Sequence, residues 1–117
     1  MNPIPFQTTD WMSLPEEKNN GTTGFSSSRT LHYGDLRIRL VKYSANYLAD
    51  HWCKRGHILY CMEGELTTEL EHGQTVTLRA GMSYQVSDDM SSHRSSTLHG
   101  ATLFIVDGGF LGTNKSL

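Results

Sequence analysis

The sequence is short of several residue types, and each shortage excludes a class of protein. Its 117 residues include two cysteines, Cys53 and Cys61, which excludes a framework of several disulfides. Proline is scarce, with three residues, and a charged fraction of 19% with an apolar fraction of 37% is ordinary for a globular chain and unlike a disordered or fibrous one. A chain of this length fits one domain with one hydrophobic core.

An excess of one charge is also missing. The formal net charge is −2, and the ten lysines and arginines do not cluster, which argues against nucleic acid or an anionic membrane as a partner. No apolar stretch is long enough to span a bilayer. Residues 1–6 lack the basic start and apolar run of a signal peptide. We therefore expect a cytoplasmic protein that binds neither nucleic acid nor a membrane.

A helical repeat of apolar residues is absent as well, and an alternation typical of strands takes its place. From Arg29 onward, apolar and polar residues alternate over short segments. Turn signals at 34–35, 63–65, 72–73 and 80–81 separate these segments. The clearest expected strands are 36–40, 47–53, 58–62, 66–71, 75–79, 83–86 and 101–106. Eight or nine short strands with regular turns predict an all-β sandwich or barrel.

The two ends of the chain differ from this pattern. Residues 1–28 hold all three prolines and a run rich in Asn, Gly and Ser, with apolar anchors such as Phe6 and Trp11. A floppy terminus is one interpretation. We favour an arm that packs on the barrel or on a partner subunit, because exposed aromatic side chains are a liability. The domain itself is expected over 29–107, followed by a C-terminal tail over 108–117.

One stretch concentrates donor atoms that transition metals prefer. His51 and Cys53 are two residues apart, so on a strand their side chains share a face. His57 follows four residues later, past Gly56, where the chain can turn or bulge. The three side chains are therefore expected to face one cavity from two neighbouring strands, which is how a sheet builds a metal site.

These residues also have purely structural interpretations. An inward-facing histidine is often a hydrogen-bonded core residue, and a buried cysteine often acts as a small hydrophobe. Cys61 shares the strand parity of His57 and is expected to be a core thiol, with a redox pair to Cys53 as the alternative. Arg37 and Arg39 are expected on a solvated outer face. The alternative is that they reach into the barrel and hold an anionic ligand.

The layout resembles the cupins, a superfamily of small β-barrels. Their first motif is written G-x5-H-x-H-x3-4-E-x6-G. On this chain its two histidine positions fall on His51 and Cys53, its glutamate position on His57 and its closing glycine on Gly64. The opening glycine position holds Ala45. The run 50–53 is similar to the element of a subgroup of small uncharacterised cupins with an Asp-His-Cys-Trp motif, with the last two residues exchanged.

The second cupin motif, G-x5-P-x-G-x2-H-x3-N, matches less well. Its histidine falls on His93, and its first glycine lies one residue out of step with Gly81. Its proline, second glycine and asparagine positions hold Asp88, Met90 and Thr97. The resemblance covers about residues 30–107 and implies the double-stranded β-helix, or jelly-roll barrel, of the cupin fold.

The resemblance implies a metal site made of His51, Cys53, His57 and His93. Three imidazoles and a thiol favour zinc, iron, nickel or copper over magnesium or calcium. A closed tetrahedron of all four would suit structural zinc, whereas three histidines without Cys53 would leave positions open for catalysis.

For function, the resemblance implies a small-molecule pocket, and two hypotheses follow. The first is a metal-dependent dioxygenase or isomerase. The second is a non-catalytic module that binds a small ligand or a structural metal, because fold does not fix function. We also expect a homodimer, since small barrels have exposed edges that natural proteins tend to cover.

Overall fold

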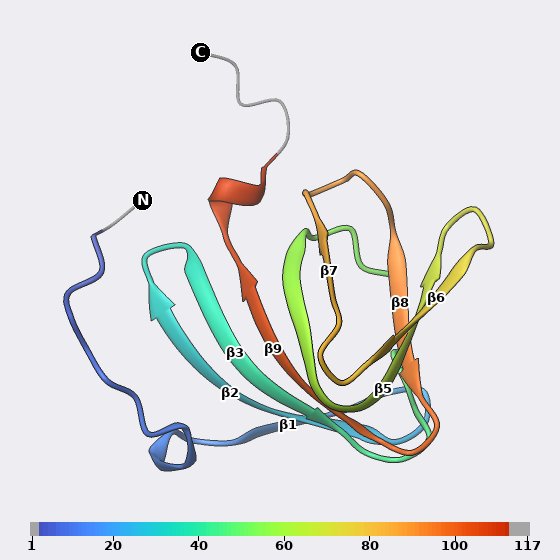
Figure 1. Ribbon diagram of the computed structural model, residues 1–117, viewed down its shortest axis with the longest axis horizontal. Helices are drawn as coiled ribbons and strands as arrows, with labels where there is room; N and C mark the ends of the chain where they lie inside the picture. Colours follow the sequence, from blue (N-terminus) through green and yellow to red (C-terminus); the bar gives the residue numbers. More distant parts are fainter. Residues whose placement is uncertain (1–2, 113–117) are drawn as a thin grey trace.

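The computed structural model describes residues 3–112, and these fold into a single curled antiparallel sheet (Figure 1). The order along the sheet is β1-β2-β3-β9-β5-β8-β4, and β6 and β7 also pair with β5. The strands are β1 (Glu17–Asn20), β2 (Phe25–Tyr33), β3 (Leu36–Tyr43), β4 (Tyr47–Leu48), β5 (His57–Leu70), β6 (Thr75–Arg79), β7 (Ser83–Val86), β8 (His93–Thr97) and β9 (Ala101–Asp107). Two short 3-10 helices, η1 (Trp11–Ser13) and η2 (Gly109–Leu111), lie outside the sheet.

The longest strand, β5, connects the two halves of the curled sheet. Its first half pairs with β7 and β9, and its second half pairs with β6 and β8. The chain bends between these halves, where the register with β9 shifts after Cys61 and Gly64 takes a φ of 77°. The expected turn at 63–65 is therefore a bend inside one strand. Glycine suits both roles, because a side chain at positive φ is strained.

Cross-strand register separates the central sheet into an inner and an outer face. On β3, β9 and β5, the residues in register at one level are Ile38, Val106 and Ile58, and the neighbouring level is Arg37 and Asp107 beside His57. Side chains alternate between faces along each strand, so these two levels face opposite ways. The first set lies on the outer face, and the second lies toward the cavity.

This register places two arginines differently from the favoured sequence interpretation. Arg37 and Arg39 line the cavity rather than a solvated outer face. The apolar residues Ile38 and Leu40 lie on the opposite face instead. The expected alternation is present, but a period of two does not say which face a barrel closes over.

The hydrophobic core lies deeper in the barrel, on the inner faces of β3, β5, β6 and β9. Its fully buried members include Leu59, Leu66 and Leu103, together with the thiol of Cys61. Leu66 is paired with Leu78 across the β5–β6 hairpin, whose alternating pattern is as expected. This core holds the strands that carry the site described below.

Regular structure begins earlier than the expected arm suggests. Strand β1 and the start of β2 lie within 1–28 and pair with each other. The arm also docks: the ring of Trp11 meets that of Phe104 edge-on, with centroids 5.8 Å apart, on the outer face of β9. Phe6 is 98% exposed and docks on nothing described. Of the expected tail, η2 is described, and residues 113–117 lie outside the described residues. No helix among residues 3–112 is both long and apolar enough to cross a membrane.

Candidate metal centre and its cavity

Three of the four predicted metal ligands come together in the structure. One ligand atom each from Cys53, His57 and His93 lies within 4.8 Å of the others. Within residues 3–112 this is the one group of three or more such side chains placed to hold an ion. Both histidines are buried, and Cys53 is half-buried.

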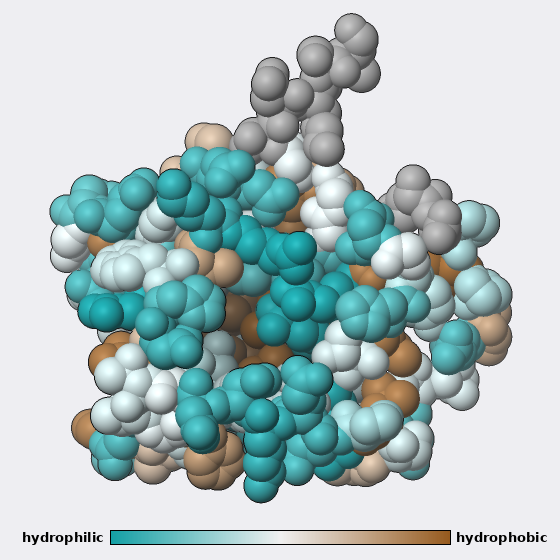
Figure 2. All heavy atoms as spheres, turned by 180° about the vertical axis from the view of Figure 1, so that it is seen from behind, coloured by the Kyte–Doolittle hydropathy of each residue, from teal (hydrophilic) through white to brown (hydrophobic). Residues whose placement is uncertain are grey.

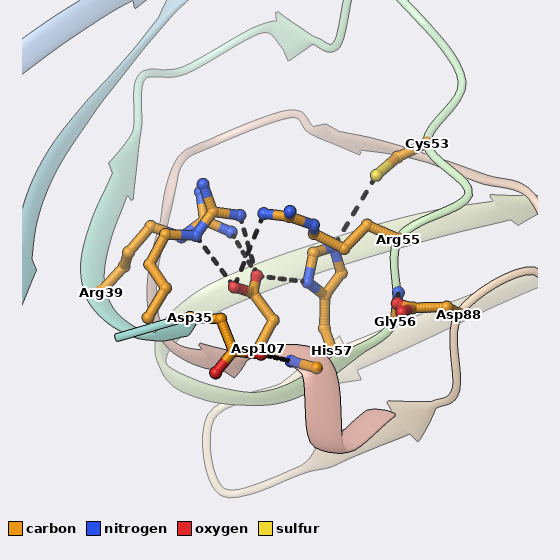
Figure 3. A network of polar contacts seen from close by, with 10 residues as sticks. Asp35, Arg39, Cys53, Arg55, Gly56, His57, Asp88 and Asp107 are labelled. Atoms are coloured by element: carbon orange, nitrogen blue, oxygen red, sulfur yellow. Dashed lines mark hydrogen bonds and ion pairs between the residues drawn. The ribbon is translucent and has the colours of Figure 1, made fainter. Parts of the chain in front are cut away.

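Backbone hydrogen bonds fix Cys53 beside His93. The amide of Cys53 donates to the carbonyl of His93 at 2.8 Å, and the amide of His93 donates back at 2.9 Å. The loop that carries Cys53 is also tied at Gly56, whose amide donates to the carboxylate of Asp88 at 2.6 Å (Figure 3). The expected strand over 47–53 is regular only at β4, so this bridge, rather than a continuous strand, positions the thiol.

A carboxylate on a neighbouring strand orients His57. The Nδ1 atom of His57 lies 3.0 Å from Oδ2 of Asp107, and Nε2 lies 4.0 Å from Sγ of Cys53. Figure 3 shows the imidazole between the carboxylate and the thiol. We assign a proton to Nδ1, because a carboxylate accepts a hydrogen bond there, and Nε2 faces Cys53. Metal-binding histidines commonly have such a partner.

The second histidine has the same arrangement with a backbone partner. Nδ1 of His93 lies 3.1 Å from the carbonyl oxygen of Ser91, so it donates there. Its Nε2 atom is buried and has no hydrogen-bond partner among the described residues. A buried polar atom without a partner is costly, and native proteins rarely leave one without a reason. Of the two Nε2 atoms beside the thiol, that of His57 contacts Sγ of Cys53 and that of His93 has no partner among the described residues.

The thiol itself is activated. The neighbouring imidazoles, His57 first and then His93, lower the pKa of Cys53 to about 5, well below the ordinary value of 9.0. Burial lowers the pKa of His57, but the hydrogen bonds to Asp107 and Cys53 outweigh it and raise that pKa above its ordinary value. The thiolate is the form that binds metals. The donor set, one thiolate and two imidazoles, thus fits a transition metal.

The fourth predicted ligand, His51, lies outside this group. Its side chain is 75% exposed, and its Nδ1 atom lies 2.6 Å from the carboxylate of Asp50. His51 still lines the rim of the same cavity, as its shared parity with Cys53 predicts. Its role as a ligand stays a prediction.

The three donors open onto a cavity of about 490 Å³. Its lining includes apolar and cationic side chains, among them Val41, Leu59, Ile105, Arg37, Arg39 and Arg55. Figure 2 shows the molecule hollowed near the middle of the face opposite to that of Figure 1, with hydrophilic side chains around the rim and hydrophobic ones at depth. A volume of this order suits a small-molecule ligand.

Two tyrosines on the inner face add hydroxyl groups to the cavity wall. Burial raises the pKa of Tyr43 to about 12, and burial also raises that of Tyr84. Both hydroxyls therefore stay protonated at neutral pH. Tyr84 and His93 also line a second, more apolar cavity of about 240 Å³ near Val86.

A carboxylate that no local pattern singles out lies at the centre of this site. Asp107, the last residue of β9, is 1% exposed and lies among three arginines and His57. Burial raises its pKa, but hydrogen bonds from His57 and Arg37 outweigh this and hold the pKa well below its usual range. Only the pairing of β3, β9 and β5 brings these charged groups together, and such long-range pairing is not visible in a local sequence pattern.

The other cysteine takes the structural role that was expected. Cys61 is fully buried in the core, and its thiol donates toward the carbonyl of Glu63 at 3.5 Å. Burial raises its pKa, so the thiol stays protonated. It is not among the grouped donors.

Comparison with known proteins identifies the fold. No family model and no curated protein matches the chain. Among solved structures, an RmlC-like cupin from Shewanella frigidimarina matches with a TM-score of 0.71 at 18% identity, covering 89% of this chain and 91% of that one. A sugar phosphate isomerase from a cupin superfamily, from Silicibacter pomeroyi, has a TM-score of 0.71 at 14% identity, covering 87% and 75%. Ectoine synthase from P. lautus has a TM-score of 0.71 at 18% identity, covering 88% and 78%.

These likenesses confirm the expected fold class. The chain has the all-β fold of the small cupins, a curled antiparallel jelly roll. At such low identity the shared property is the fold. What the cavity does must therefore be argued from this chain's own residues.

Proposed function

We propose that this chain binds one divalent transition metal through Cys53, His57 and His93 and a small molecule in the adjoining cavity. The observation that carries the proposal is the convergence of three donor atoms within 4.8 Å, with Nδ1 of each imidazole held by a partner on the far side of the ring. The buried Nε2 atom of His93 has no hydrogen-bond partner among the described residues, whereas a histidine that serves only the core would have both ring nitrogens satisfied.

The donor set limits which metal ions the site would bind. A thiolate and two imidazoles favour zinc, iron, nickel or copper, and they disfavour magnesium and calcium, which prefer oxygen ligands. Three protein ligands are typical of a site that keeps a coordination position open, whereas structural zinc sites are closed by four. A metal held here would supply Lewis-acid or oxygen-binding chemistry to the cavity. His51 as a fourth ligand is the alternative that would close the site.

Two outcomes for the cavity stay open, and a specific observation bears on each. The metal-dependent isomerase or dioxygenase is supported by the open position beside a cavity of about 490 Å³, and two structural neighbours carry the names of small-molecule enzymes. The non-catalytic binding module is supported by the state of Asp107. That carboxylate is bound by Arg37 and His57 and has a lowered pKa, so it does not accept protons at neutral pH.

Elemental analysis of the protein purified without an affinity tag tests the metal site. We expect about one equivalent of zinc, iron, nickel or copper in the wild type, and a loss of most of it in His57→Ala and His93→Ala. His51→Ala is the matched control, because this exposed histidine lies outside the group. Retention of metal in both His57→Ala and His93→Ala, or absence of metal from the wild type, would refute the site. Loss in His51→Ala would add that residue to the ligand set.

We also propose a cytoplasmic homodimer that associates through the outer face of the sheet. Ile58 and Tyr60 on β5 are 41% and 46% exposed, and they lie in register with Val106 and Phe104 on β9. Trp11 covers part of this apolar face at Phe104, and the exposed part at Ile58 and Tyr60 is the part offered to a second copy. Sedimentation of wild type and Tyr60→Glu tests it: a dimer that becomes a monomer is expected, and a monomeric wild type would refute the proposal.

A further inference from the structure

The cavity carries more positive charge than its carboxylate can neutralise. Arg37 alone satisfies Asp107, since its Nε and Nη2 atoms lie 2.9 Å from the two carboxylate oxygens. Nη2 of Arg39 is a further 3.3 Å contact, and Nη1 of Arg55 is 3.9 Å away. Three guanidinium groups thus face one carboxylate, and His57 approaches it too (Figure 3). Structural neutralisation of Asp107 accounts for one arginine and leaves two unexplained.

The two surplus groups, Arg39 and Arg55, line the cavity. The side chain of Arg39 is 21% exposed and that of Arg55 is 55% exposed. The Nε atom of Arg39 is buried without a hydrogen-bond partner among the described residues. Burial, and then the neighbouring charge of Arg37, lower the pKa of Arg39, although it remains a cation. An unpartnered guanidinium N–H in such a place costs stability unless something accepts its hydrogen bond.

Few groups on the cavity wall oppose these charges. The Cys53 thiolate lies on the other side of the His57 ring from Asp107 and its arginines. The one acidic side chain among the lining residues is Glu17, on the edge strand β1. A fourth lining arginine, Arg94, is already paired, with Nη2 2.9 Å from Glu69 and the guanidinium 5.1 Å from the ring centroid of Trp52. Arg39 and Arg55, beside Arg37, are therefore placed to bind an anion that is not part of the described chain.

We propose that Arg37, Arg39 and Arg55 form a subsite for a small oxyanion, so that the ligand of this cavity is an anionic small molecule bearing a carboxylate or phosphate group. Planar guanidinium groups match both oxyanions with paired hydrogen bonds. The inference rests on the proposed function, because the rest of the ligand would face the Cys53–His57–His93 group. The ring of His57 lies between the two, with Nδ1 toward the arginines' carboxylate and Nε2 toward the thiol.

The subsite is tested on metal-free protein, so that a metal does not itself bind the anion. The protein is stripped with a chelator, dialysed and titrated calorimetrically with inorganic phosphate, with malonate and with neutral glycerol. We expect saturable binding of at least one oxyanion, no binding of glycerol, and a shift of the Arg39 Nε–H resonance in nitrogen-15 spectra. Binding of phosphate alone would identify the ligand's anionic group as a phosphate, and binding of malonate alone would identify it as a carboxylate. Binding of neither would overturn the subsite.

Two variants and a matched control make the assignment specific. Arg55→Gln and Arg39→Gln should weaken the oxyanion about 10- to 100-fold, the effect of one charged hydrogen bond. Arg55 is 55% exposed, so its replacement should leave the fold intact. Arg79→Gln is the control, because Arg79 is exposed on β6 and lines no part of this cavity. Equal affinity in all three variants would overturn the assignment.

Failure here is distinguishable from failure of the metal site. A protein that retains metal but binds neither oxyanion contradicts the subsite and leaves the proposed metal site standing. If the stripped protein binds phosphate or malonate but elemental analysis finds no metal in the purified wild type, the metal site is contradicted and the arginine subsite stands.

Discussion

The replacement Asp107→Asn removes one negative charge from the centre of the site and leaves the shape nearly unchanged. Asp107 is 1% exposed and accepts hydrogen bonds from Arg37, Arg39 and His57. Leaving buried charges without their partner typically costs about 3–5 kcal/mol. The cost is reduced here because the side chains of Arg37 and Arg39 are 27% and 21% exposed to water, and because the introduced amide retains one acceptor oxygen. We therefore expect a loss of about 2–3 kcal/mol in the free energy of unfolding.

Urea denaturation at pH 7 measures this loss. The control is Asp35→Asn, an exposed carboxylate near the same end of the sheet that accepts from the amide of Gly109 at 2.9 Å, and it should cost less than about 1 kcal/mol. Equal losses in the two variants would refute the idea that Asp107 neutralises buried charge.

The pH dependence of the same pair gives a second readout. The folded pKa of Asp107 is lowered from its ordinary 3.8, so its stabilising contribution is full above about pH 4 and is lost as the pH falls toward the folded pKa. The difference between wild type and Asp107→Asn should therefore shrink below about pH 4. A constant difference would show that lost packing, not charge, explains the variant.

The remaining predictions concern the thiol, the metal ligands' orientation and the bend in β5. In chelator-stripped protein, alkylation of Cys53 by iodoacetamide should rise with a midpoint near pH 5 in the wild type; a midpoint above 8 would contradict the hydrogen-bonded thiolate. Asp107→Asn should weaken metal binding about 10- to 100-fold in a competition with a chelating dye, because His57 loses its orienting partner; unchanged affinity would argue against His57 as a ligand. Gly64→Ala should lower the midpoint of thermal unfolding, because a Cβ at φ 77° would meet the carbonyl of Gly100. Gly73→Ala is the control: it has φ 97° but open space around it, so it should lower the midpoint less, by the cost of the positive φ alone.

The strand pattern could be predicted from the sequence because it is local. Alternation over 36–40 and 66–71 and the turn glycines located most strands, and all-β architecture followed. The long strand β5 was missed because Glu63-Gly64-Glu65 looks like a turn, and a bend with a positive φ uses the same residue type. Only pairing with β9 distinguishes the two.

The site was predicted in part for a similar reason. Cys53 and His57 were found from their types and spacing, and His93 from the resemblance to cupins, and the structure groups all three. Sequence spacing also included His51, whose ring the irregular chain after β4 leaves exposed beside Asp50.

The charged half of the site was beyond sequence reasoning. Arg37 and Asp107 are 70 residues apart and meet only because β3 pairs with β9. A local pattern contains no information about such a pairing, and alternation alone does not say which face becomes the interior.

The mutual backbone bridge between Cys53 and His93 separates the placement of this donor from its chemical identity. Both hydrogen bonds of the bridge come from main-chain atoms, so exchanging the side chain at position 53 leaves the frame in place. At position 53 the backbone can therefore present a thiolate, an imidazole or a carboxylate to the same two rings. A lineage that keeps this frame can change its preferred metal by one substitution, and a protein engineer can do the same with Cys53→His or Cys53→Asp.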